Sequence, residues 1–148
     1  ADAALAAIPN FAGIKVSKPD LFEFQELLSG FGDRLDLFWG SDETLLPALS
    51  VGAVAAVGST YNHSAPLYRQ LIGAWERGAI AEARELAARS VAMVRALVPG
   101  GVLANQKALL AARGLPLGPP RPPLVPAAPG TGERFAARFD AEGWWGDR

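Results

Sequence analysis

Polar residues accompany three short apolar runs of this sequence and form its candidate functional residues. Lys15 and Ser17 belong to the first run (FAGIKVS), residues 40–43 (GSDE) follow the second, and residues 58–62 (GSTYN) follow the third. A neutral lysine amine can attack a carbonyl carbon, and burial favours the neutral form because it penalises the ammonium. The sequence therefore predicts a nucleophilic lysine with two polar loops that form part of the same ligand site.

Each of these residues also has a simpler structural interpretation. A lone lysine in an apolar strand can extend its amine to the solvent at the rim. Asp42 can cap the helix that follows it, and Glu43 would then favour the helix N-terminus. Ser59 and Thr60 can satisfy backbone groups in a turn. Taken singly, these positions leave both interpretations open.

Two further features are interpreted as structural. His63, the only histidine, lies in a polar stretch and is expected to be an exposed loop residue. The pair Trp144-Trp145 is expected to pack in the fold or form an interface. A multi-histidine metal site within the chain is excluded, and the absence of cysteine excludes disulfides and thiolate ligands.

The apolar runs alternate with helical patterns, which predicts a parallel sheet covered by helices. We expect strands at residues 11–16, 35–39 and 53–57, the last with both faces covered because its run is continuously apolar. Helices are expected at residues 1–8, 17–30 with Ser17 as cap, 42–50, 67–77, 80–97, 102–113 and 133–141, with a Pro-rich connector at 114–130. In parallel α/β folds the ligand site lies at the carboxyl ends of the strands, where all three polar groups fall.

The composition limits the classes of partner. The chain has 148 residues, 14 Lys plus Arg against 15 Asp plus Glu, and about half of its residues are apolar. This balance offers no basic face for nucleic acid and no basic amphipathic segment for a membrane surface. We therefore expect neither nucleic acid nor a membrane as partner, and the lack of an apolar run long enough to span a bilayer and of a signal-like first segment favours a cytoplasmic protein.

Three segments together resemble a known family. "GIKVS", "GSDETLLPALSVGAVAAVGSTYN" and "GLPLGPPRPPL" are similar, in order and spacing, to the C-terminal half of the N-acetylneuraminate lyases, members of the dihydrodipicolinate synthase superfamily of class I aldolases. The resemblance implies strands 6 to 8 of a (β/α)8 TIM barrel followed by extra C-terminal helices. It divides the chain into a partial barrel at residues 1–78 and a helical extension at residues 79–148.

The resemblance also implies a reaction. Lys15 matches the lysine that forms a Schiff base with the keto carbon of pyruvate or of a sugar acid, so that N-acetylneuraminate is cleaved to pyruvate and N-acetylmannosamine. No metal or diffusible cofactor is implied. The remaining matched positions hold the substrate: Ser17, Gly40 through its backbone, Asp42, Glu43 and Ser59.

Alternatives remain within and outside the superfamily. Aldolases of keto-deoxy sugar acids and dihydrodipicolinate synthases share the lysine, although the synthases usually lack the Asp42-Glu43 pair. The first five strands of the family barrel have no counterpart here, so we expect a fragment or one half of a split barrel, poorly soluble or oligomeric and catalytically silent alone. The family implies a homotetramer. A non-catalytic remnant that acts as an interaction module is the remaining alternative.

Overall fold

A computed structural model of the chain describes residues 1–146. It divides into two compact units, Ala1–Ser59 and Thr60–Arg148. The boundary predicted at residue 78 divides a partial barrel from a helical extension, which is a different division from that between compact units. It stays a prediction. The elements in chain order are α1 (Asp2–Ala7), β1 (Gly13–Val16), α2 (Leu21–Phe31), β2 (Asp36–Trp39), the 3-10 helix η1 (Asp42–Thr44), α3 (Leu45–Ser50), β3 (Ala55–Ala56), α4 (Tyr61–Glu76), α5 (Ile80–Leu97), α6 (Val102–Ala112) and α7 (Thr131–Glu142).

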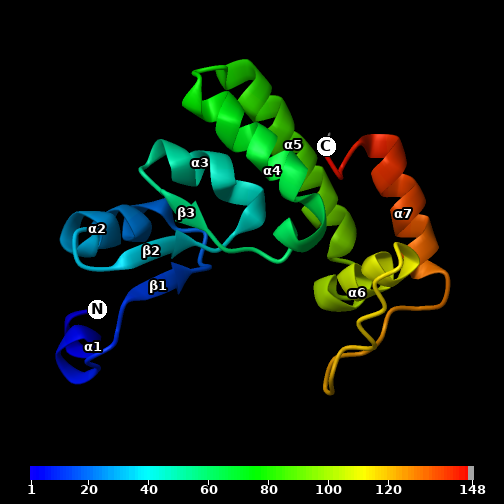
Figure 1. Cartoon of the computed structure of the whole chain (residues 1–148), viewed down its shortest axis with the longest axis horizontal. Coiled ribbons are helices and arrows are strands. Elements are labelled where there is room, and N and C mark those ends of the chain that lie inside the picture. The colour runs from blue at the N-terminus through cyan, green and yellow to red at the C-terminus, as the bar shows by residue number, and fades with distance from the viewer. Residues whose placement is uncertain (147–148) are drawn as a thin grey trace. The chain divides into compact units, whose positions relative to one another are not determined.

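The first unit contains a three-stranded parallel sheet in the order β1-β2-β3 (Figure 1). Strand β1 pairs with β2 so that Lys15 lies beside Phe38, and Phe38 lies beside Ala55 of β3. Paired residues of parallel strands point to the same face of the sheet. Lys15, Phe38 and Ala55 therefore share one face, and their chain neighbours point to the other.

That other face carries the core of the first unit. Val16, Leu37 and Trp39 are buried together with Phe24 of α2 and Ala48 of α3. The ring of Phe24 meets the indole of Trp39 edge to face, with ring centroids 5.0 Å apart. Aromatic pairs prefer this geometry, which adds to the area that they bury. Helices α2 and α3 thus cover the face opposite Lys15.

Two local predictions in this unit are wrong. The residue that caps α2 is Asp20, whose side chain accepts a hydrogen bond from the Glu23 amide, and not Ser17, because the Pro19 segment delays the first helical turn. Strand β3 has two residues, and neighbouring Val54 is 91% exposed. The continuous apolar run did predict a strand, but its two faces are not both covered in this chain.

The second unit is helical. Figure 1 shows α4 and α5 side by side, and α6 packs against α7. Helix α4 begins at Tyr61 rather than at residue 67, so it includes the later part of the predicted polar loop, and it has a break in helical geometry at Ser64. The break allows Pro66 to lie inside the helix, since proline cannot donate the backbone hydrogen bond of a regular turn. The predicted helices at 80–97, 102–113 and 133–141 match α5, α6 and α7 closely.

The C-terminal aromatic residues pack within this unit. Trp144 is 2% exposed and meets the ring of Phe139, with centroids 5.2 Å apart. The guanidinium of Arg138 lies 4.8 Å from the Trp144 ring, and the Trp145 indole donates to Asp140. The expectation that Trp144 packs in the fold is confirmed.

Candidate functional site

Lys15 lies near the carboxyl end of β1, on the face of the sheet that α2 and α3 leave open. Its side chain is exposed, whereas Val16 beside it is buried. Of the two interpretations that the sequence left open, the exposed amine is the one found in this chain, because alternation along the strand directs Lys15 away from the helix-covered core. The position at the strand end agrees with the site predicted from the sequence.

Gly40 brings the first two polar groups together. Its amide donates to the carbonyl of Val16 at 2.7 Å, which continues the pairing of β1 and β2 beyond the strand end. A methyl group added to Gly40 would lie 2.5 Å from Ser17 Oγ and 2.7 Å from Lys15 Cε. A residue without a side chain is needed here, because these two side chains occupy the space beside the backbone.

Ser41 and Trp39 fix the loop after β2. Ser41 Oγ donates to the carbonyl of Ser17 at 2.8 Å, which links this loop to the loop after β1. The Trp39 indole donates to the carbonyl of Ser41 at 2.9 Å and to Thr44 Oγ1 at 3.1 Å. A buried aromatic residue therefore holds the second polar loop. Sequence analysis did not assign Ser41 a role, although its place between Gly40 and Asp42 was a signal.

Asp42 is buried, with 7% of its surface exposed, inside η1. It caps neither short helix, since η1 begins after Ser41 and α3 after Thr44. Its carboxylate instead occupies the space beside Gly58, where an added methyl group would overlap it. The cap interpretation of Asp42 is therefore wrong, and the second and third polar loops meet at this contact.

The contacts thus form two groups. Lys15, Ser17 and Gly40 meet at the ends of β1 and β2, and Asp42 meets Gly58 next to Ser59. Glu43 is half-buried and Ser59 is exposed, and neither takes part in these two contacts. The arrangement presents an amine, a hydroxyl and a carboxylate from successive strand-end loops. These groups suit covalent capture of a carbonyl and hydrogen bonding to hydroxyls.

Residues 1–146 contain no group of three or more histidine, cysteine, aspartate or glutamate side chains arranged to hold a metal ion. In the same range, no single helix is long and apolar enough to cross a bilayer, and only the pair α5 and α6, bent by 101°, meets those limits jointly.

His63 is not an exposed loop residue. It lies in α4 and is mostly buried, with its ring 5.3 Å from Phe139 and 6.4 Å from Trp145 between centroids. Its Nδ1 shares a hydrogen bond with Ser64 Oγ, and its buried Nε2 has no partner among residues 1–146. Burial lowers the pKa of His63 to about 4. The polar sequence around it concealed this, because its aromatic neighbours lie far along the chain.

Comparisons with known proteins identify the class of this fold. Residues 3–141 match the model of the dihydrodipicolinate synthetase family. The chain is 36% identical over 120 residues to the N-acetylneuraminate lyase of Rhizobium meliloti, covering 81% of this chain and 40% of that protein. It is also 36% identical over 122 residues to 4-hydroxy-tetrahydrodipicolinate synthase 1 of Streptomyces coelicolor, covering 81% and 39%.

Among solved structures, Proteus mirabilis N-acetylneuraminate lyase superposes with a TM-score of 0.88 at 37% identity, covering 96% of this chain and 48% of that one. The chain spans less than half the length of each of these proteins. The predicted fold, an α/β chain like the C-terminal half of a TIM barrel, is confirmed. The assignment of catalytic and binding roles to single residues stays a prediction.

Proposed function

Because the chain belongs to the dihydrodipicolinate synthetase family, we propose that it supplies the lysine-bearing part of a class I aldolase that cleaves N-acetylneuraminate to pyruvate and N-acetylmannosamine. The observation that carries the proposal is the position of Lys15 at the carboxyl end of β1, on the open sheet face and against Gly40 and Ser17. Since the chain spans less than half of its relatives, the activity is proposed for the complete barrel.

The proposed chemistry begins at the Lys15 amine. Attack on the C2 carbonyl of the substrate, followed by loss of water, gives an iminium ion. When the C4 hydroxyl gives up its proton and the C3–C4 bond breaks, the electron pair of that bond moves toward the iminium nitrogen and leaves an enamine, while the sugar portion departs as an aldehyde. Protonation at C3 and hydrolysis of the imine release pyruvate and restore the amine. No metal or diffusible cofactor takes part in this scheme.

Lys15 differs in its surroundings from its neighbour Lys18. Hydrogen bonds and ion pairs with Glu23 and Asp20 raise the pKa of Lys18 above its ordinary value. Those interactions hold Lys18 as an ammonium, which has no lone pair to attack a carbonyl. Among the described residues, no carboxylate lies within ion-pair distance of Lys15. This contrast supports Lys15 rather than Lys18 as the nucleophile.

The other site residues are proposed to hold the substrate. Ser17 lies beside the Lys15 side chain, where its hydroxyl would reach the captured keto acid. We assign the backbone of Gly40, the carboxylates of Asp42 and Glu43, and the hydroxyl of Ser59 to the polyol part. Carboxylates accept charge-assisted hydrogen bonds from hydroxyl groups, and these are stronger than neutral ones.

The choice of substrate rests on the second polar loop. Overall identity does not distinguish a lyase from a synthase, since both relatives are 36% identical to the chain. The Asp42-Glu43 pair favours a hydroxyl-rich sugar acid, because two carboxylates suit donors of that kind. A synthase or another pyruvate aldolase is the alternative. A cytoplasmic homotetramer is proposed by resemblance to the family.

The test is borohydride trapping with pyruvate, followed by intact mass measurement and peptide mapping. We expect one reduced pyruvate adduct on the peptide that contains Lys15. Lys15→Arg should abolish the adduct, because a guanidinium stays protonated and cannot attack. Lys18→Arg is the matched control and should leave the adduct in place. An adduct that persists in Lys15→Arg would overturn the assignment.

A chimera covers the case in which the isolated chain forms no adduct. Residues 3–141 replace the matching segment of the Rhizobium meliloti lyase, and pyruvate release from N-acetylneuraminate is measured on the folded chimera. Release that depends on Lys15 is expected. A folded chimera that traps pyruvate at Lys15 but does not cleave N-acetylneuraminate would favour the alternative aldolases, and one that does neither would contradict the proposal.

A further inference from the structure

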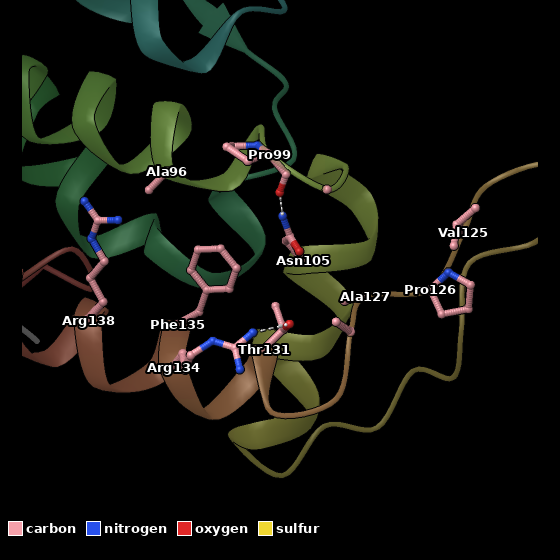
Figure 2. Close-up of a pocket in the computed structure, with 12 residues that line it drawn as sticks. Ala96, Pro99, Asn105, Val125, Pro126, Ala127, Thr131, Arg134, Phe135 and Arg138 are labelled. Atoms are coloured by element: carbon pink, nitrogen blue, oxygen red, sulfur yellow. Dashed lines mark hydrogen bonds between the residues drawn. The ribbon is translucent and has the colours of Figure 1, made fainter.

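A cavity of about 740 Å³ lies within the helical unit, between the C-terminal end of α5, the start of α6, the Pro-rich connector and α7 (Figure 2). Its volume falls in the range of small-molecule sites, roughly 300–1,000 Å³. The lining is mostly apolar and includes Phe135, Val125 and Pro126. None of the residues proposed for the aldolase site lines it.

Two arginines of α7 contribute to the lining. Arg134 and Arg138 are four residues apart, so they lie on the same side of the helix. Among the residues that the structure describes, no carboxylate lies within ion-pair distance of either guanidinium. Arg134 donates to Thr131 Oγ1 at 2.8 Å, as Figure 2 shows, and Arg138 stacks on Trp144. Each still has N–H groups for a ligand, since a guanidinium carries five.

A buried amide supplies the third polar group. Asn105 is 3% exposed, and its Nδ2 donates to the carbonyls of Leu97 and Pro99 at 2.9 and 2.7 Å. These two bonds fix which end of the amide is the oxygen. Asn105 lines the cavity, and the hydrogen bonds of its side chain among residues 1–146 are these two donations from Nδ2, which leave Oδ1 to accept one from a ligand. The cavity therefore combines cationic donors, a fixed acceptor and an apolar wall.

We propose that this cavity binds a small organic carboxylate that has an apolar body and a hydroxyl group. The carboxylate pairs with Arg134 and Arg138, because guanidinium groups bind carboxylates with charge-assisted hydrogen bonds. The apolar body lies against Phe135 and the connector, and the hydroxyl donates to Asn105 Oδ1. The predominantly apolar lining favours such a ligand over inorganic phosphate. This site is additional to the proposed aldolase site.

The test measures binding of 4-hydroxybenzoate to the complete chain by isothermal titration calorimetry, in buffer without carboxylate or phosphate. Two probes serve as matched comparisons: 4-hydroxybenzamide has the same shape without the charge, and benzoate lacks the hydroxyl. We expect 4-hydroxybenzoate to bind at least about tenfold more tightly than the amide. Benzoate should bind a few-fold more weakly than 4-hydroxybenzoate, since only the bond to Asn105 is lost.

Variants connect the binding to the cavity. Arg134→Gln and Arg138→Gln should each weaken 4-hydroxybenzoate binding by about tenfold and leave the amide nearly unchanged, so the preference for the acid collapses. Arg89→Gln, an exposed arginine of α5 outside the cavity, should bind as the unaltered chain does. Lys15→Arg should also bind normally, which separates this site from the aldolase site. Circular dichroism verifies that each variant is folded.

Any one of four results would overturn the proposal. The folded chain does not bind 4-hydroxybenzoate, or it binds the acid and the amide equally, or both arginine variants keep the preference for the acid. If Lys15→Arg loses binding of 4-hydroxybenzoate while Arg134→Gln keeps it, the probe binds at the proposed aldolase site. That result would also contradict the second site.

Discussion

The two compact units differ in how their central elements are covered. In the sheet unit, Phe22 and Val54 are 73% and 91% exposed, and the proposed nucleophile Lys15 stands on an open face. In the helical unit three buried hydroxyl groups pair with one another: Tyr68 OH lies 2.6 Å from Thr60 Oγ1 and 2.8 Å from Ser90 Oγ. Both units expose some large apolar side chains, among them Val125 in the helical unit at 74%, so the difference lies in the sheet face that carries the proposed chemistry, which the helices of its unit leave open.

This difference has a physical reason. A parallel sheet normally has both faces covered, and here helices cover only the face that carries Leu37 and Trp39. The helical unit closes its own core, since Leu71, Met93 and Phe139 are fully buried. Because buried apolar area is the main source of stability, we expect the helical unit to be the more stable of the two. Three predictions test this comparison.

The largest effect is expected in the aromatic cluster of the helical unit. Phe139→Ala should lower the free energy of unfolding by about 3–5 kcal/mol, the usual cost of removing a buried phenyl ring. Phe139 is fully buried and contacts the rings of His63, Trp144 and Trp145. Urea unfolding followed by circular dichroism measures the change.

Phe22→Ala is the matched control in the sheet unit. This residue is 73% exposed, so the same substitution should change stability by less than about 0.5 kcal/mol. Equal losses in the two variants would contradict the difference in packing between the units.

The second effect is a pH dependence from His63. Burial lowers the pKa of His63 to about 4 in the folded chain, against an ordinary value of 6.5. Below pH 6.5 the unfolded state therefore binds a proton that the folded state does not, and stability falls as the pH drops from 6.5 toward 4. This difference in proton binding lowers the free energy of unfolding by about 2 kcal/mol between about pH 7.5 and about pH 5.

His63→Gln isolates this contribution, because it removes the titrating ring. The free energy of unfolding of the unaltered chain, taken relative to this variant and measured by urea unfolding, should fall by about 2 kcal/mol from about pH 7.5 to about pH 5. A pH dependence that is the same in both chains would mean that His63 titrates normally and is not held in the aromatic cluster.

Most of the fold could be predicted from the sequence because its signals are local. Short apolar runs predicted the strands. The glycines and prolines between segments with helical spacing of apolar residues predicted most of the helix ends. The strand-end position of Lys15 followed from the same reasoning, since parallel strands place their carboxyl ends at one edge of the sheet. Gly40 was predicted only as a backbone contact to the substrate, by resemblance to the family, and its close fit against Lys15 and Ser17 comes from the structure.

What could not be predicted depends on contacts between distant residues. His63 stands in a polar stretch of the sequence, and its burial depends on the packing of Phe139 and Trp145, which lie far along the chain, against its ring. Asp42 has a typical capping sequence, yet it contacts Gly58, sixteen positions further along the chain. The charge-bearing cavity beside α7 likewise combines Asn105 with Arg134 and Arg138 from another helix. No local pattern marked any of these three.

The smallest effect on stability, and the most informative one for the site, concerns Gly40. Gly40→Ala would put a methyl group 2.5 Å from Ser17 Oγ, 2.7 Å from Lys15 Cε and 2.9 Å from the Val16 carbonyl. The Ser17 and Lys15 atoms can move, whereas the Val16 carbonyl belongs to the backbone, so the cost in stability should be about 1–2 kcal/mol, in the lower part of the range for overpacking. Moving Lys15 Cε displaces the amine, so the yield of trapped pyruvate should fall well below that of the unaltered chain.

Gly30→Ala is the control, since nothing lies within 4 Å of that position in α2, and alanine there should stabilise the helix by about 0.5–1 kcal/mol. Trapping that is unchanged in Gly40→Ala would mean that the exposed Lys15 reacts from an unconstrained position, and the open face of the sheet would then contribute less to positioning than the loop geometry suggests.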